Sequence, residues 1–515
     1  MTRASCGAFT ALLLGISGSA DALEVDTSSE SSGLDEFLDA PADSSSAPVI
    51  RATWQLDLQV AADTGHEDID AHVGRLDVSG RMVLDAELTS GMSAFAAPKF
   101  QYVAAISKSG DDREQLFLEA PEAFVRISLG PFRLRLGNLI FAWGVSDLVG
   151  PIDVLNPIDL RASLFTDVGS AKLPVLGVEA TYGAGPLTLR GVVLPVFTAS
   201  RFRLDGWDTA LSVVLDAAGF PLPSFDAMLS PSLSDRVLDE AIAIDRPSDS
   251  PENATLALRA TLGLGEVDLG VSVVHGFEPL PTVYIDRDAA VLLDGALQSF
   301  GSGQPFDLTD PELLGAIGRI RDAQEQGRPL FMGTYDRRTV VGFDGSIAVD
   351  PLLLKVDAAY TFERTLYTQE FQSVRLPYLN AMIGLEYAEG EDLQADVEVF
   401  AIAAAEVRSY YRLLFLEGRS DPPSSTDVGA RTIAMPGVAA ALRSSFFLDG
   451  DLETAIAVIS TFDPVNVVLM ARLRYSVDDQ SSIVAGAVGV AGKHGSFGEL
   501  YSHLDEVFVG YRLAL

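Results

Sequence analysis

Long segments in which every second residue is apolar constrain the fold of this chain more than any other feature. In Trp54–Val60 the apolar residues alternate with Gln and Asp, and residues 354–363 and 467–475 follow the same rule. A period of two places alternate side chains on opposite faces of a strand. Many of these segments run for about 10–14 residues, whereas soluble strands average about 5–6 and a tilted strand needs about 9–11 to cross a bilayer. The pattern therefore predicts transmembrane β-strands.

The composition supports this interpretation and excludes other classes. Apolar residues make up 48% of the 515 residues, yet no apolar run of 18 residues follows the N-terminus, which excludes ordinary transmembrane helices. The net charge of −36 would repel nucleic acid, so we expect no nucleic-acid partner.

The order of the alternating segments predicts an all-β fold, a transmembrane antiparallel up-and-down barrel of about 18 strands, or 16 if one segment is a loop. Short connections rich in turn residues alternate with longer ones near 144–171, 199–252, 278–337 and 404–431, as in barrels with short periplasmic turns and long extracellular loops. We place the strands near 51–61, 72–88, 92–105, 116–129, 132–143, 172–182, 187–198, 253–262, 267–277, 338–349, 352–364, 378–388, 392–403, 432–448, 451–460, 465–476, 482–491 and 502–515.

The N-terminal residues predict export. Residues 1–22 have a positive start at Arg3, a short apolar stretch and the small residues Ala20 and Ala22 of a signal-peptide cleavage site. Residues 23–48 contain no Lys or Arg and are expected to form a disordered acidic leader, which leaves 49–515 for the barrel. The single cysteine, Cys6, lies in the signal peptide, so the mature chain would hold no disulfide and no thiolate metal site.

The last strand alternates from Val507 to Leu515 and resembles the C-terminal recognition strand of outer-membrane barrels, although such strands usually end in an aromatic residue. The resemblance implies the barrel-assembly machinery as a partner, and the apolar face implies outer-membrane lipid.

Two of the long loops contain helix signals. Thr309-Asp310-Pro311-Glu312 has the form of a capping box before an apolar stripe that ends near Gly327, and Ser234 is a candidate cap for a second helix. The apolar stripes need burial, either on the barrel rim or as a plug or lid in its mouth.

One sequence motif begins in the fifth predicted strand and extends into the long connection before the sixth. It comprises Leu136–Gly144, Asp147 and Pro151–Arg161, and includes Trp-Gly followed by Asp-x-x-Asn-Pro-x-Asp. Here the chain resembles a family of uncharacterised proteobacterial outer-membrane barrels, in which Gln is common at the position of Asn138. The resemblance implies a porin-like protein, and the family is often found beside efflux or hydrophobic-compound transport components.

The motif residues allow several roles. Asn and Asp cap turns, but their oxygens also line pores or bind a hard cation such as Ca²⁺. Trp143 is interpreted as a residue of the aromatic girdle at the membrane surface, with ligand stacking as the alternative. The motif-loop candidates are Trp143, Gly144, Asp147, Asp153, Asn156, Pro157 and Asp159.

Charged residues fall on the face opposite the apolar one, where they would either line a pore or pair across neighbouring strands. A basic wall beside an acidic wall would suit amphiphilic or zwitterionic solutes. The pore-lining candidates are Arg133, Arg135, Arg190, Arg259, Lys355, Asp357, Asp396, Glu398, Arg472, Arg474 and Arg512, and Glu179 and Glu363 share their face.

We expect no enzyme, cofactor or bound metal, because the five histidines are scattered and no GxSxG, HExxH, Walker or GxGxxG motif occurs. A hydrolase built from His494, His503 and Ser496 or Ser502 is the least favoured alternative. The favoured function is a porin-like channel or transporter for small hydrophobic or amphiphilic molecules of unknown identity. The alternative is a non-conducting structural or surface-interaction barrel.

Overall fold

The computed structural model of the chain describes residues 49–514 with gaps. The gaps are 64–71, 108–112, 161–170, 203–242, 303–308, 327, 329–330, 370, 391, 415, 418–428, 448–449, 494–495, 497 and 499–504. The predicted signal peptide, the acidic leader and the helix predicted after Ser234 lie outside the described residues.

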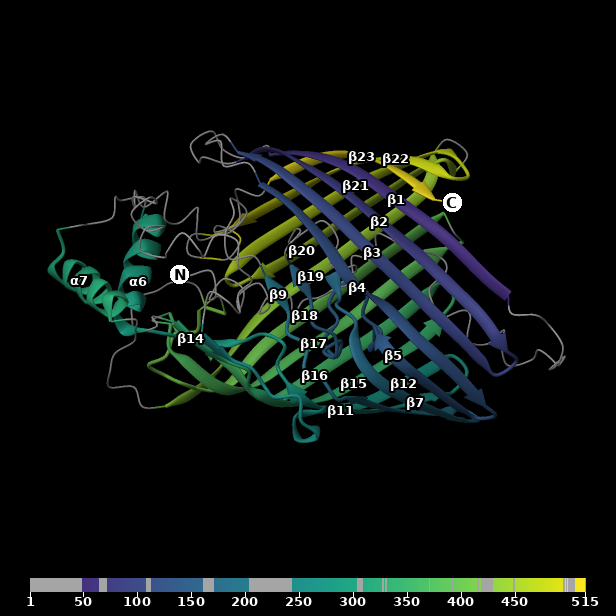
Figure 1. Cartoon of the computed structure of the whole chain (residues 1–515), viewed down its shortest axis with the longest axis horizontal. Helices are drawn as coiled ribbons and strands as arrows, with labels where there is room; N and C mark the ends of the chain where they lie inside the picture. Colours follow the sequence, from purple (N-terminus) through teal and green to yellow (C-terminus); the bar gives the residue numbers. More distant parts are fainter. Residues whose placement is uncertain are drawn as a thin grey trace.

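Eighteen strands form one closed sheet, which confirms the predicted all-β barrel and the larger of the two strand counts. Each strand pairs antiparallel with the next along the chain, and β23 pairs back with β1, with Leu58 opposite Tyr511 (Figure 1). The strands are β1 Val49–Asp63, β2 His72–Thr89, β3 Met92–Ser107, β4 Arg113–Leu129, β5 Phe132–Leu139, β7 Val175–Ala184, β8 Leu187–Leu194, β11 Thr255–Gly263, β12 Val267–Phe277, β15 Arg337–Val349, β16 Leu352–Tyr367, β17 Ser373–Glu389, β18 Leu393–Arg408, β19 Ala430–Phe447, β20 Leu452–Phe462, β21 Val465–Asp478, β22 Ser481–Gly492 and β23 Glu506–Ala514.

The alternation separates the two faces of the barrel wall. Apolar residues such as Leu58, Phe343 and Val509 are exposed on the outside, whereas Asp357 and Glu398 on the inside are fully buried. Such a belt of exposed apolar side chains is unfavourable in water and matches the lipid-facing band of a membrane barrel.

The two ends of the barrel differ as predicted. The short connections predicted from turn residues lie at one end, which we call the turn end. Glycines with positive φ, such as Gly130 (58°) and Gly185 (59°), provide their backbone geometry. The long connections lie at the other end, the loop end. Two details differ from the prediction: β5 stops at Leu139 instead of continuing to residue 143, and Asp463-Pro464 makes a short turn at the loop end.

Two helices, α6 Arg287–Ser302 and α7 Pro311–Glu325, extend beyond the strand ends at the loop end (Figure 1). Helix α7 was predicted, but its cap is Asp310, whose Oδ1 accepts the Glu312 N–H at 2.8 Å. Helix α6 was not predicted. The two helices contribute to one buried apolar cluster. Because both lie beyond the strand ends, they cover the rim and do not enter the barrel as a plug (Figure 1).

Smaller elements complete the loop end. The strands β10 Ala243–Asp245, β14 Phe331–Thr334 and β13 Thr282–Ile285 form a small sheet, β6 Asp159–Leu160 pairs with β9 Arg201–Phe202, and η4 spans Pro251–Asn253. Among the described residues, no helix has the length and apolar character needed to span a membrane.

Candidate functional site

Residues 140–158, here called the lumen loop, follow β5 and carry most of the sequence motif. Asn156 ties the two ends of this loop together. Its side-chain amide donates to the carbonyls of Leu139 (3.0 Å) and Leu173 (2.9 Å), and its Oδ1 accepts the Phe141 N–H at 2.7 Å. Asn156 is buried, so its amide and these backbone groups cannot bond to water in the folded protein. The three hydrogen bonds satisfy these groups instead.

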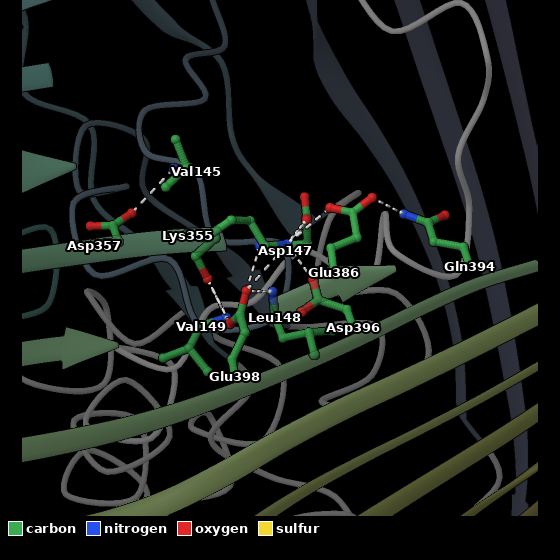
Figure 2. Close-up of polar contacts among 11 residues, drawn as sticks. Val145, Asp147, Leu148, Val149, Lys355, Asp357, Glu386, Gln394, Asp396 and Glu398 are labelled. Atoms are coloured by element: carbon green, nitrogen blue, oxygen red, sulfur yellow. Dashed lines mark hydrogen bonds and ion pairs between the residues drawn. The ribbon is translucent and has the colours of Figure 1, made fainter. Parts of the chain in front are cut away.

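The tip of the lumen loop is bound by the far wall of the barrel. Glu398 of β18 accepts the N–H groups of Asp147 (3.0 Å) and Val149 (2.9 Å), as Figure 2 shows. It also accepts the Ser146 hydroxyl at 2.8 Å. Counting from β5 through β7, β8, β11, β12, β15, β16 and β17, β18 is the eighth strand in a ring of 18. The loop therefore crosses the lumen almost along a diameter.

Lys355 of β16 provides the second attachment. Its ammonium contacts Asp147 of the loop and Asp396 of β18, and lies 3.2 Å from Glu386 of β17 (Figure 2). The oxygens of Asp147, Glu386 and Asp396 lie within 4.8 Å of one another, a spacing that would also suit a cation. The Lys355 ammonium, whose side chain is fully buried, lies among these carboxylates and supplies a positive charge to them, so the geometry assigns the cluster to loop attachment.

Gly144 allows the loop to approach the wall closely. Its φ of +112° is unfavourable for other residues, and a Cβ atom would overlap Asp357 Oδ2 and press on Ile152. The following N–H, that of Val145, donates to Asp357 Oδ2 at 3.4 Å. The glycine of the Trp-Gly pair is thus explained by contact with β16.

The interpretation of Trp143 as a membrane-girdle residue is wrong. Its side chain is 4% exposed and packs edge-on against Phe141, with ring centroids 6.4 Å apart. The Arg259 guanidinium lies 5.8 Å from the Trp143 ring centroid. Because β5 ends at Leu139, Trp143 turns into the lumen with the loop and does not reach the outer surface.

The other motif residues have structural contacts. Asp153 pairs with Lys172 at 2.5 Å, and Asp159 lies 3.8 Å from Arg201. Burial raises the pKa of the Asp153 carboxyl, and the Lys172 ammonium opposes that rise. The carbonyl of Pro157 accepts the Leu173 N–H at 2.8 Å. These contacts favour the turn-and-cap interpretation over a cation site, since Asp153, Asn156 and Asp159 bind different partners.

A basic arc lies on the inner face of β5, β7, β8, β11 and the part of β4 that pairs with β5. This part of the wall carries five arginines and one carboxylate, Glu179. Arg135 pairs with Glu179 at 2.5 Å, and Arg259 pairs with Asp344 of β15 at 2.7 Å. The arginines are Arg126, Arg133, Arg135, Arg190 and Arg259.

Aromatic rings accompany this arc. Arg126 and Arg135 each lie 5.5 Å from the centroid of Phe124, and Arg135 lies 5.9 Å from Phe141. Guanidinium groups and aromatic rings therefore lie side by side on this inner face. The ring quadrupoles stabilise the positive charge of the guanidinium groups.

The remaining predicted arginines lie on the inner face of the opposite part of the wall. Arg512 pairs with Asp57 at 2.6 Å, and the Arg474 Nε donates to Ser482 at 3.2 Å. Arg472 stands opposite Ala455 of β20 and Gly486 of β22. The structure does not bring these three residues to the lumen loop.

Accessibility separates the two signs of charge. The carboxylates Asp357, Asp396 and Glu398 are at most 3% exposed because the lumen loop covers them. Arg133, Arg190, Arg472 and Arg474 are all partly exposed. Among the pore-lining residues predicted from the sequence, the accessible charges are therefore basic, while Asp57 (30% exposed) and Asp147 (44% exposed) add accessible carboxylates outside that set.

Several contributors were missed from the sequence. Arg126 and Phe124 share the inner face of β4, and their two-residue spacing was a usable signal. Glu386 and Asp344 also occupy the polar positions of alternating strands, but the sequence did not show their partners, which lie on other strands. Of the residues proposed for a hydrolase, Ser496 is fully buried, and His494, His503 and Ser502 lie outside the described residues.

Residues 49–227 match the family described as "Protein of unknown function (DUF1302)". The resemblance inferred from the motif is confirmed for this segment. The DUF1302 match includes the lumen loop, whereas Lys355, Asp357 and Glu398, which hold the loop, lie beyond it.

A search of curated proteins found no match. Among solved structures, OccK5 (OpdH) of Pseudomonas aeruginosa has 10% identity and a TM-score of 0.43, over 90% of this chain and 98% of the other. OccAB4 of Acinetobacter baumannii has 8% identity and a TM-score of 0.46, over 92% and 100%. A BenF-like porin from Pseudomonas fluorescens Pf-5 has 9% identity and a TM-score of 0.45, over 91% and 98%.

Proposed function

We propose that this chain is an outer-membrane channel of a Gram-negative bacterium that passes small amphiphilic molecules, preferentially those with a negative charge. In this proposal the signal peptide directs export, the barrel-assembly machinery recognises β23, and lipid covers the exposed apolar belt. The lumen loop is the observation that carries the proposal. Glu398 and Lys355 fix this loop across the lumen. In this proposal the loop is the constriction that selects solutes by size and charge.

The charge of the lumen supports the preference for anions. The accessible arginines lower the energy of an anion inside the pore, because a low-dielectric wall strengthens their field. The rings of Phe124 and Phe141 beside these arginines offer an apolar surface to the rest of an amphiphilic solute. The original expectation of hydrophobic or amphiphilic cargo is thereby narrowed to amphiphiles.

The test is single-channel recording of the purified protein in a planar bilayer under a KCl gradient. We expect discrete conductance steps and a reversal potential of the sign that indicates Cl⁻ preference. Replacing Arg133 and Arg190 together by Gln should shift the reversal potential toward zero, because both are partly exposed on the inner face. Arg319→Gln, at a 56% exposed arginine of helix α7 outside the barrel wall, is the control and should leave it unchanged.

A barrel that inserts but never conducts would contradict the channel proposal and favour a surface-interaction barrel. In that case the α6–α7 helices at the rim are the natural contact surface, with Leu314 exposed on α7.

A further inference from the structure

A polar pocket lies inside the barrel, between the second half of the lumen loop and the inner face of β15, β16 and β17. Its volume is about 660 Å³, including the part open to solvent. Asp153 and Asn156 of the lumen loop line one side of it. Arg338 of β15, Arg364 of β16 and Tyr378 of β17 line the other. We call this space the polar pocket.

The charges around the polar pocket favour an anion. Its lining contains two carboxylates, and each of them already pairs with a cation, Glu278 with Arg338 and Asp153 with Lys172. Arg364 adds a further positive charge to the lining. The field inside a low-dielectric pocket of this kind attracts an anionic group, whereas a cationic group would meet Arg338 and Arg364.

One hydrogen-bond donor of the polar pocket has no acceptor among the residues that the structure describes. The Tyr378 side chain is 1% exposed, and its hydroxyl makes no hydrogen bond there. The Arg364 guanidinium lies 4.4 Å from the centroid of the Tyr378 ring. A buried hydroxyl without a partner is unfavourable, and an ionised acceptor beside a guanidinium would satisfy it. A compact anionic head group such as a carboxylate has the acceptor oxygens for this position.

An apolar pocket adjoins the polar pocket on the side of β7, β8 and β12. Its volume is about 420 Å³, including the part open to solvent. The apolar residues of its lining include Leu155, Val175, Leu194, Val196, Phe197 and Val274. Of these, Val175, Leu194 and Val274 are at most 5% exposed, so this space lies on the inner side of the wall. We call it the apolar pocket.

The two pockets meet at Arg338. Val154, Pro279 and Arg338 line both of them, and Arg338 donates to the Val154 carbonyl at 3.3 Å. A third space toward the loop end also has Arg338 and Arg364 in its lining, together with Tyr367, the last residue of β16. The polar pocket therefore continues toward the end of the barrel at which the long connections lie.

We propose that the polar and apolar pockets form one binding site for a small amphiphile with a single compact anionic head group and a short apolar tail, such as a medium-chain carboxylate. The head group lies between Arg338, Arg364 and the Tyr378 hydroxyl, and the tail lies in the apolar pocket. Because Arg338 stands where the pockets meet, a head group bound there leaves the tail at the entrance of the apolar pocket. This inference rests on the proposed channel function and names the head and the tail of its solute.

The experiment is isothermal titration calorimetry of the full-length purified protein in a non-ionic detergent, with the heat of each probe in protein-free micelles subtracted. The probes are hexanoate, acetate, which has the head group without the tail, and 1-hexanol, which has the tail without the charge. We expect hexanoate to bind more tightly than acetate, since each buried CH₂ group raises the affinity by about fourfold. We expect 1-hexanol to bind more weakly than hexanoate, because it lacks the charge.

Two variants separate the head from the tail. Tyr378→Phe removes only a hydroxyl that has no partner among the described residues, so the unfolding midpoint should not fall, but hexanoate and acetate should both bind about tenfold more weakly. Tyr387→Phe, at the turn end of the same strand, is its control, since that hydroxyl donates to Glu389 at 3.0 Å. Val196→Trp fills the apolar pocket and should weaken hexanoate but not acetate. Val193→Trp, on the 42% exposed outer face, is its control.

A heat-modifiable gel shift identifies the folded variants, and the conductance of each protein is recorded in planar bilayers. The site is wrong if the folded wild type binds no hexanoate, or if Tyr378→Phe and Val196→Trp bind it as tightly as the wild type. Equal losses of hexanoate and acetate affinity in Val196→Trp would contradict the separate tail pocket. A protein that conducts without binding hexanoate overturns the site and leaves the channel standing. Pocket-dependent binding by a protein that never conducts supports the site and contradicts the channel.

Discussion

At the residue scale, Glu398 accepts backbone N–H groups of the lumen loop. Elsewhere in the barrel, carbonyl groups of a neighbouring strand accept such N–H groups. At residues 147–149 one carboxylate accepts the N–H groups of three consecutive residues, and the Val149 N–H also donates to the Ser146 hydroxyl at 2.8 Å. Bonds to an ionised acceptor are stronger than neutral ones. Glu398 is therefore the residue on which the position of the loop depends most.

Replacing Glu398 by Ala should release the loop tip, because several buried donors lose their acceptor at about 1–3 kcal/mol each. We expect a larger and noisier single-channel conductance and faster cleavage of the loop by added protease. Glu398→Gln keeps an acceptor oxygen and should show a smaller change.

The control for this prediction is Glu363→Ala, at a 64% exposed carboxylate of β16 that pairs only loosely with Arg375 (3.4 Å). A Glu398→Ala protein with wild-type conductance and wild-type protease resistance would show that other contacts hold the loop.

At the element scale, the lumen loop is an ordered segment fixed at three places. Asn156 joins its two ends, Gly144 permits close packing on β16, and Lys355 with Glu398 fixes its tip. The Asn-Pro pair in the motif fits this arrangement, since the Asn156 amide donates to two backbone carbonyls and the Pro157 carbonyl accepts the Leu173 N–H.

Asn156→Asp should destabilise this element by about 2–4 kcal/mol, because it removes both amide donors and buries a carboxylate beside two carbonyl oxygens. The measurement is the midpoint of thermal or urea unfolding in detergent micelles, with protease sensitivity of residues 140–158 as the local readout. Asn253→Asp is the matched control, since Asn253 also donates to a backbone carbonyl (Ser248, 2.9 Å) but at an exposed site. Equal effects of the two substitutions would contradict the role assigned to Asn156.

At the scale of the whole molecule, stability depends on closure. The seam between β23 and β1 extends over nine residue pairs and is reinforced by Arg512 with Asp57 and by buried Arg75 of β2 with Glu506 at 2.9 Å. An open sheet would expose two edges of unpaired N–H and C=O groups to lipid, which a membrane does not tolerate.

Deleting residues 506–515 should therefore abolish the folded barrel, not merely weaken it. The expected result is loss of the heat-modifiable band on gels and loss of insertion into liposomes. Arg51→Ala removes a distant and exposed ion pair with Glu87 (3.8 Å) and should leave both properties intact. A truncated chain that still inserts and shows the band shift would contradict the dependence on closure.

The sequence by itself determined the barrel. Two-residue alternation and turn residues are local properties, so the strands, their order and the two unlike ends could be predicted. Helix α7 could be predicted for the same reason, because the apolar stripe between Glu312 and Ile320 is also a local pattern. The site was predicted only as separate parts. Whether Lys355 and Glu398 face solute or hold a loop depends on contacts with Asp147, more than 200 positions away in the chain.

Only the tertiary structure decided that the motif turns into the lumen, that Trp143 is buried there and that the carboxylates of one wall are covered while arginines remain accessible. The physical reason is that a barrel interior is shared by strands remote in sequence. The partner of each inward side chain is set by how the sheet closes and by where the loop lies, and neither leaves a local pattern.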